Sequence, residues 1–336
     1  MNDIYISIFD GLLSDYKAQD ILKQSGIISG IEVYSLVQHY ESIKSSGLKC
    51  AAHDPLVFEM NNLGNPNWLS VFESPQGRKV LNLIRNTNSP VVAFHCGFSA
   101  EKVYKMRAYP DAPEISTLFT SRERLLSVIC DNILGFERLL NESTPPELQK
   151  QVLLEPMDYT RKRPIDWEIQ SHKVKVHKFE IEKVFEKFGT NAALQWVCDI
   201  DFYRDLYQSL ENKGILPIGF LFDISHVFIT ADTKIHQREY GGSITDYFEE
   251  LLQIIGDKVY QIHVNVPEGN PLDGYTDGHL PFTKGNELSQ FILRLTKKVI
   301  KNSPNLKTMT LEIRGNKNMH PIEFANLMIA QANLFA

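Results

Sequence analysis

The stretch GFLFDISH, residues 219–226, contains the two features that decide the fold. Its first four residues are continuously apolar, which is typical of a parallel strand that is buried on both faces of its sheet. Asp223 ends the apolar run, and His226 follows three residues later. The stretch therefore predicts a buried strand that carries polar side chains at its C-terminal end.

Seven further runs of the chain are rich in β-forming residues and short enough to be strands. Together with Gly219–Asp223 they make eight: Ile4–Phe9, Gly30–Tyr34, Leu48–Ala52, Val91–His95, Val152–Glu155, Val259–Val264 and Met309–Ile313. Segments with the apolar period of a helix lie between them, most clearly Ser121–Leu140, Ile244–Ile255, Glu287–Ile300 and Pro321–Leu334. This alternation predicts right-handed βαβ units, and eight such units close into a (β/α)8 barrel, the TIM-barrel fold.

A doubly wound open sheet is the alternative architecture. A dinucleotide site in such a sheet carries a GxGxxG motif after the first strand, and no such motif follows Ile4–Phe9. The chain has 336 residues, of which 43% are hydrophobic. Barrels routinely use this many residues in one domain, so we expect residues 1–336 to form a single TIM-barrel domain.

The composition also restricts partners and location. A net charge of −6 disfavours binding to duplex nucleic acid, which requires a basic face. The four cysteines form no CxxC pair, which disfavours a zinc knuckle or a disulfide framework and favours a reducing compartment. No apolar run reaches the roughly 18 residues of a membrane span, and the N-terminus has no signal-peptide pattern. We therefore expect a soluble, cytoplasmic protein without a membrane partner.

Two long connections interrupt the alternation. Gly97–Ser116 follows the fourth strand, and Tyr159–Trp196 is a long insertion after the fifth strand, with the basic stretches RKR at 161–163 and HKVKVHK at 172–178. Basic stretches of this kind are usually solvated surface. Loops after barrel strands lie over the active face, however, so the alternative is that the insertion at 159–196 holds an acidic or peptide substrate.

Side chains with nitrogen or oxygen donor atoms stand at or soon after the ends of six successive strands. They are His53, His95, Glu155, Asp223, His226, His263, Asp277, His279 and Glu312. Active sites of TIM barrels lie at this C-terminal end of the strands. Four carboxylates in one cavity would repel one another, and bound cations are the simplest remedy. Imidazoles mixed with carboxylates suit zinc, iron or manganese, and nine donors are more than one ion takes, so we predict two or three ions.

Each of these residues also has an ordinary structural explanation. A single histidine such as His53 is more often a structural residue than a ligand, and Asp277-Gly-His279 fits ordinary turn chemistry. Glu312 can pair with Arg314. The metal site is preferred because the donors recur in strand order and always at C-terminal ends.

Other polar residues lie at the edge of this pattern or outside it. Glu32 ends the second strand and is either a catalytic base or a residue that orients a ligand histidine. Asn265 and Tyr159 are candidates for substrate contact. Cys96 is expected in the barrel wall as a small buried hydrophobe, with a redox role as the alternative. The remaining histidines are expected at the surface: His39, His172, His177, His236 and His320.

The order His, His, Glu, Asp-x-x-His, His, Asp-x-His, Glu resembles the metal-ligand series of the xylose-isomerase-like barrel superfamily, especially its endonuclease IV branch. A closer resemblance, to the multinuclear non-haem iron oxidases, rests on LLEPMDY at 153–159, QWVCDIDFYRDL at 195–206, GFLFDISHVFITA at 219–231, IHVNVPEG at 262–269 and DGHLPF at 277–282. This resemblance implies two or three iron ions, with zinc or manganese as alternatives, and oxidation by O2 of a residue, often cysteine, in a ribosomally made precursor peptide. It also implies a partner protein that presents the peptide.

The resemblance further implies a role for each donor. Glu155 would bridge two ions. The first ion would also be bound by His53 and His95, and the second by Asp223, His263 and Glu312. A third ion would be held by His226, Asp277 and His279. Of these residues, we predict catalytic roles for Glu155, Asp223 and His263.

An iron-dependent peptide oxidase is therefore the leading hypothesis for function. The first alternative is a zinc-dependent hydrolase of the endonuclease IV type, in which metal-activated water attacks a phosphodiester. The second is a sugar isomerase or epimerase, in which metal ions polarise a carbonyl and a carboxylate moves a proton. A peptide-binding barrel with an inactive site is the non-enzyme alternative, disfavoured because all nine donor positions are filled.

Overall fold

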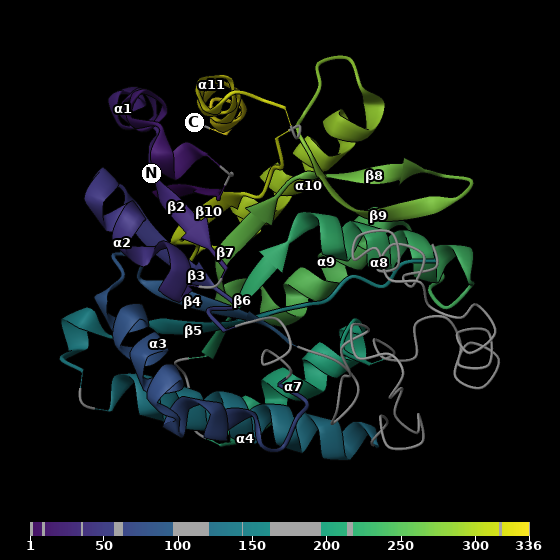
Figure 1. The fold of residues 1–336 in the computed structure, drawn as a ribbon. Coiled ribbons are helices and arrows are strands. Elements are labelled where there is room, and N and C mark those ends of the chain that lie inside the picture. Colours follow the sequence, from purple (N-terminus) through teal and green to yellow (C-terminus); the bar gives the residue numbers. More distant parts are fainter. Residues whose placement is uncertain are drawn as a thin grey trace, which may run out of the picture.

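The computed structural model describes residues 3–8, 11–34, 36–56, 63–96, 121–142, 144–161, 196–213, 218–315 and 318–335. Within them, eight parallel strands form a closed barrel in the order β1-β10-β7-β6-β5-β4-β3-β2 (Figure 1). The strands are β1 (Asp3–Ser7), β2 (Ile28–Val33), β3 (Lys49–His53), β4 (Val91–His95), β5 (Gln151–Glu155), β6 (Ile218–Asp223), β7 (Val259–Val264) and β10 (Thr308–Leu311). The predicted (β/α)8 barrel is confirmed, and the open sheet is wrong.

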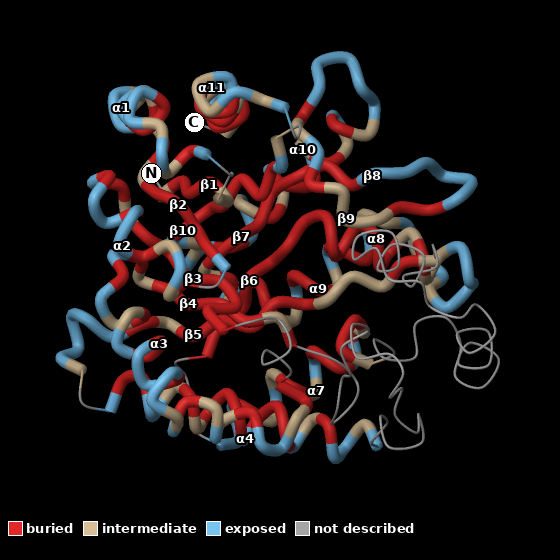
Figure 2. Tube along the Cα trace, viewed as in Figure 1, coloured by how far each residue is buried: buried red, intermediate tan, exposed pale blue. Residues whose placement is uncertain are grey.

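Helices surround the barrel and cover its outer face (Figure 1). They are α1 (Tyr16–Ser25), α2 (Leu36–Ser46), α3 (Pro75–Asn86), α4 (Arg122–Asn141), α7 (Ile200–Asn212), α8 (Ile224–His236), α9 (Ile244–Ile255), α10 (Glu287–Asn302) and α11 (Pro321–Ala332), with short 3₁₀ helices at Leu12–Ser14, Trp68–Glu73, Pro146–Leu148 and Gly256–Lys258. The four helices expected from apolar periodicity are α4, α9, α10 and α11, each within two residues of its expected bounds. Figure 2 shows buried residues along the barrel strands and exposed residues on the outer turns of the helices.

The strands separate two apolar layers, and this separation fixes where the polar residues point. Val91, Ala93, Leu153 and Leu221 form a small cluster of their own, apart from the large core that the strands share with the helices. These four residues therefore fill the inside of the barrel. Because side chains alternate across a strand, the residue two positions further on also faces inward. By this rule His95, Glu155 and Asp223 point into the C-terminal mouth of the barrel.

A hairpin follows β7, in a part of the chain where the sequence analysis assigned no strand. It consists of the antiparallel strands β8 (Val266–Asn270) and β9 (Gly274–Leu280), which pair with each other and form a separate two-stranded sheet. In Figure 1 the hairpin projects beyond the barrel on the side of α8. Its tip turns at Gly274, whose φ of +89° suits glycine. The hairpin matters for the site because β9 carries Asp277 and His279.

Part of the sequence prediction lies outside the described residues. The loop Gly97–Ser116 lies there, as does the insertion at 159–196 apart from residues 159–161 and 196. Among the described helices, none is long and apolar enough to cross a membrane.

Candidate metal centre

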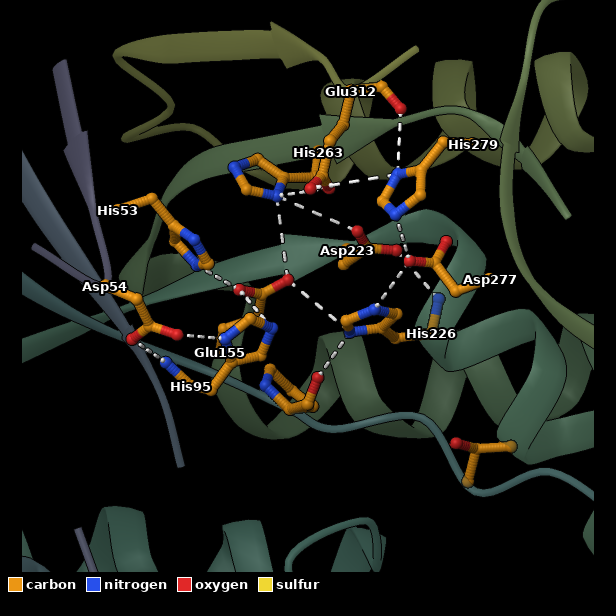
Figure 3. A network of polar contacts seen from close by, with 12 residues as sticks. His53, Asp54, His95, Glu155, Asp223, His226, His263, Asp277, His279 and Glu312 are labelled. Carbon is orange, nitrogen blue, oxygen red and sulfur yellow. Dashed lines mark hydrogen bonds and ion pairs between the residues drawn. The ribbon is translucent and has the colours of Figure 1, made fainter. Parts of the chain in front are cut away.

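The structure brings all nine predicted donor side chains together at the C-terminal mouth of the barrel (Figure 3). We call these nine residues the donor cluster. All are buried except His95 and Asp277, which are half-buried. The cluster draws on six barrel strands or their immediate ends, on the first turn of α8 for His226, and on β9 for the last Asp-x-His pair. Within this cluster the residues form three groups.

The first group is His53, His95 and Glu155. The Nε2 atom of His53 lies 2.5 Å from Oε2 of Glu155, and the Nε2 atom of His95 lies 3.4 Å from the same oxygen. One donor atom from each residue falls within 4.8 Å of the others, a spacing that fits shared coordination of one ion.

The second group contains Glu155, Asp223 and His263, whose donor atoms also lie within 4.8 Å of one another. The Nδ1 atom of His263 lies 3.6 Å from Oε1 of Glu155 and 3.8 Å from Oδ2 of Asp223. It lies 3.0 Å from Oε2 of Glu312, which adds a fourth donor. Glu155 thus turns one carboxylate oxygen toward each of the first two groups, as a bridging ligand would.

The third group is held together through Asp277. Oδ2 of this residue lies 2.7 Å from Nε2 of His279 and 3.5 Å from Nε2 of His226. The Nδ1 atom of His279 lies 3.0 Å from the carbonyl oxygen of Glu312, and the Nδ1 atom of His226 lies 2.9 Å from the carbonyl oxygen of Pro156. Since a carbonyl only accepts, each Nδ1 carries a proton, which leaves Nε2 as the nitrogen that would bind an ion.

Unpaired buried atoms show that these residues fit metal ions. Oε1 of Glu155, Oδ2 of Asp223 and Oδ1 of Asp277 are buried, and none has a hydrogen-bond partner among the described residues. A buried polar atom without a partner costs about 1–3 kcal/mol, and more when it is charged. Cations among these atoms would remove that cost, because each is a donor of the kind that zinc, iron or manganese accepts.

The charges in the cluster act in opposite directions on its two central carboxylates. Burial opposes ionisation of Glu155, but His95, His53 and His263 outweigh it and lower the pKa of Glu155 to about 2. Burial, reinforced by the surrounding carboxylates, raises the pKa of Asp223 to about 7 although an imidazole lies nearby. Without bound cations, Asp223 is therefore the less stable anion of the two.

Residues around the cluster hold several donors in place, and sequence reasoning missed two of them. Oδ2 of Asp54 lies 2.5 Å from Nδ1 of His95, which leaves Nε2 of His95 for the first group. The hydroxyl of Tyr34 donates to Oε1 of Glu312 over 2.7 Å. Asp54 has a φ of 40°, an uncommon strained backbone for a non-glycine residue that often marks a functional site. In the sequence, only the position of Asp54 directly after His53 connected it with the site.

The other residues singled out from the sequence lie around the centre as follows. Asn265 is fully buried, and neither atom of its amide group has a partner among the described residues. The ring of Tyr159 packs 5.3 Å from Nζ of Lys234, on α8. Cys96 is completely buried, as expected, and burial raises the pKa of its thiol to about 12. The histidines expected at the surface are half-buried in α2 (His39), exposed (His236 and His320) or outside the described residues (His172 and His177).

Glu32 contacts His263 on the side that faces away from the other donors. Its Oε1 lies 2.7 Å from Nε2 of His263, and its Oε2 accepts a hydrogen bond from Gln261. Glu32 is 4% exposed, so little of it can reach a substrate. This geometry favours the orienting role over that of a catalytic base.

We therefore expect Glu32→Gln to weaken metal binding about 10–100-fold while the barrel stays folded, as for other residues that orient a ligand histidine. Competition with a chromophoric chelator measures the affinity, and circular dichroism checks the fold. Glu268→Gln, at an exposed carboxylate of β8, is the matched control. Unchanged affinity together with lost activity would instead identify Glu32 as a base.

Comparison with known proteins identifies the fold. No protein-family model matches the chain, and no curated protein matches it in sequence. A provisionally assigned xylose isomerase from Rhodospirillum rubrum ATCC 11170 has a TM-score of 0.59 at 12% identity, covering 99% of this chain and 98% of that one. A xylose isomerase domain containing protein from Salmonella typhimurium LT2 has a TM-score of 0.54 at 9% identity, covering 99% and 97%. L-ribulose 3-epimerase has a TM-score of 0.51 at 10% identity, covering 100% and 93%. The chain therefore has a TIM-barrel fold of the xylose-isomerase-like type.

Proposed function

We propose that this protein is a metal-dependent enzyme with a multinuclear centre in which Glu155 bridges two ions. The observation that carries the proposal is the position of the Glu155 carboxylate, with Oε2 beside His53 and His95 and Oε1 beside His263. Both oxygens are buried and serve different groups of donors, which a single-ion site would not require. A third ion would be held by His226, Asp277 and His279.

The leading candidate for the reaction is an iron-dependent oxidase, which the resemblance of the strand-end motifs implies and the donor set permits. Five imidazoles mixed with four carboxylates suit iron, and an open ligand position on such a centre gives access to O2. Bound iron would supply the electron transfer to O2 that oxidises a side chain, such as cysteine, of a ribosomally made peptide presented by a partner protein. The chain's own contribution is to hold the donors rigidly, through Asp54 on His95 and Tyr34 on Glu312.

A sugar isomerase or epimerase is the second candidate, and the similar structures favour it over the oxidase. Their names include xylose isomerase and L-ribulose 3-epimerase. Within the cluster, Glu155, Asp223, His263 and Glu312 would suffice for one ion, and a glutamate carboxylate would move the proton. This candidate leaves the remaining five donors unexplained, which is why the oxidase is proposed first.

Metal analysis on protein purified without oxygen or chelators tests the proposal. Two or more irons per chain with a coupled EPR or Mössbauer signal would support the oxidase. One ion per chain, together with turnover of ketose or aldose substrates, would support the sugar enzyme and contradict bridging by Glu155. Stoichiometric zinc in cells supplied with iron would contradict the oxidase and direct the assays to phosphodiesters.

A further inference from the structure

A short segment after β5 connects the bridging glutamate to the hairpin. We call residues 156–161 the strap. The strap lies along α8, because the backbone N–H groups of Tyr159 and Arg161 donate to the hydroxyls of Thr230 and Thr233 over 2.9 and 3.0 Å. Its first residue, Pro156, offers the carbonyl that fixes His226. The strap is thus anchored to α8 along its length.

The side chain of Arg161, at the end of the strap, hydrogen-bonds to the tip of the hairpin. Nη1 and Nη2 donate to the carbonyls of Leu272 and Pro271 over 2.7 and 2.6 Å. Nε donates to Oδ2 of Asp232 on α8 over 3.1 Å, and the side chains of this pair are only 9% and 15% exposed. All three nitrogens of the guanidinium are therefore used, two of them in the fork geometry that arginine provides and lysine does not.

The hairpin backbone is shaped to accept this side chain. A Cβ atom on Gly274 would lie 2.6 Å from Cγ of Arg161, so only glycine permits the approach. Beside it, the hydroxyl of Thr160 donates to the carbonyl of Tyr275 over 2.6 Å. Arginine, glycine and threonine thus form one closely packed joint between the strap and the start of β9.

This joint matters because β9 carries two of the three donors of the third group. An isolated two-stranded hairpin is marginally stable in water, and β8 and β9 pair only with each other in the described chain. β9 also packs on α8, as in the contact of Phe228 with Tyr275 at 4.9 Å. Its C-terminal end is held at His279, whose carbonyl accepts the N–H of Arg314 over 2.9 Å and whose Nδ1 donates to the carbonyl of Glu312 over 3.0 Å. The joint holds the beginning of β9 and these bonds hold its end, so the position of Asp277 between them depends on how firmly the hairpin is held at its tip.

We propose that Arg161 is the positioning residue of the third ion, because it fixes the hairpin that places Asp277 between His226 and His279. This inference rests on the proposed multinuclear centre and assigns a residue outside the donor cluster to one of its ions. The first two groups do not draw on the hairpin, so they should be insensitive to how it is held.

Arg161→Gln tests the inference through ion binding and hairpin dynamics. We expect the affinity for one ion to fall about 10–100-fold, as when other outer supports of a metal ligand are removed, while the two ions bridged by Glu155 stay bound. Amide hydrogen exchange in residues 266–280 should rise in the same variant. Arg161→Lys keeps the charge but not the forked pair of N–H donors, so its ion affinity and hydrogen exchange should lie between those of the wild type and Arg161→Gln. Arg204→Gln, at an exposed ion pair between α7 and α9, is the matched control and should change neither.

The outcomes separate this inference from the proposed function. Three ions in both wild type and Arg161→Gln, with equal affinities, would overturn the role of Arg161 and leave the multinuclear centre intact. Fewer than two ions in the wild type would overturn the centre itself, and the inference with it. Thr160→Val, which removes the bond to Tyr275 and keeps the Arg161 side chain, provides a milder variant if Arg161→Gln does not fold, and should show the same selective loss.

Discussion

Replacing Glu155 with glutamine is expected to release both bridged ions and to lower activity by about a thousandfold or more, which corresponds to roughly 4 kcal/mol of lost transition-state stabilisation. Glutamine has nearly the same size, so the packing around the fully buried residue is preserved. It is neutral, however, and offers one oxygen where glutamate offers two. His53 and His263 would then face an amide group instead of a shared anion.

Metal content by elemental analysis and turnover on the identified substrate measure this effect. Circular dichroism establishes that the barrel is still folded. Glu268→Gln makes the same chemical change on β8, at an exposed carboxylate outside the donor cluster, and should keep its metal and its activity. Wild-type metal content in Glu155→Gln would contradict the bridging role.

The barrel could be predicted from sequence because its strands are short, apolar and regularly spaced. The run GFLF, for example, is buried at every position of β6. The donor cluster could be predicted for the same reason. Once the strands are parallel and closed, residues such as Glu155 and Asp223 at their C-terminal ends must meet at one mouth.

The supports of the cluster could not be predicted, because they depend on contacts between distant segments. Tyr34 and Glu312 are 278 residues apart in sequence and hydrogen-bond in the structure. The hairpin was missed because β8 and β9 contain glycine and proline and are partly exposed, so they lack the apolar run that marked the barrel strands. The reaction could not be predicted either, because iron and zinc share these ligands and because the similar structures establish the fold alone.

Asp223→Asn is expected to have opposite effects on stability in the metal-free and metal-loaded protein. The substituted asparagine would keep the cap of α8, because Oδ1 of the native Asp223 accepts the N–H of His226 over 2.7 Å and an amide oxygen can do the same. The change is confined to Oδ2, the buried oxygen without a hydrogen-bond partner among the described residues. Differences in melting temperature therefore report the charge of this carboxylate rather than the loss of a helix cap.

In the metal-free protein the substitution should stabilise the fold and raise the melting temperature. Burial raises the pKa of Asp223 to about 7, against about 3.9 in an unfolded chain, so the folded state disfavours its ionised form. This unfavourable contribution is small at pH 4, grows between pH 4 and pH 7, and is constant above. Metal-free Asp223→Asn should therefore melt higher than metal-free wild type at pH 8, by about 5 °C, and the difference should disappear toward pH 4.

In the metal-loaded protein the sign should reverse. An ion that binds only the folded state stabilises it by about 4 kcal/mol when its concentration is a thousand times the Kd. Asp223→Asn removes an anionic donor from the second group and weakens that binding, so the variant should gain less from added metal than the wild type. Scanning calorimetry at pH 8, with and without metal, measures both effects on the same two proteins. A variant that is less stable in both states would mean that Asp223 supports the fold rather than an ion. A difference in melting temperature between variant and wild type that changes sign when metal is added would therefore show that this buried charge serves to bind a cation.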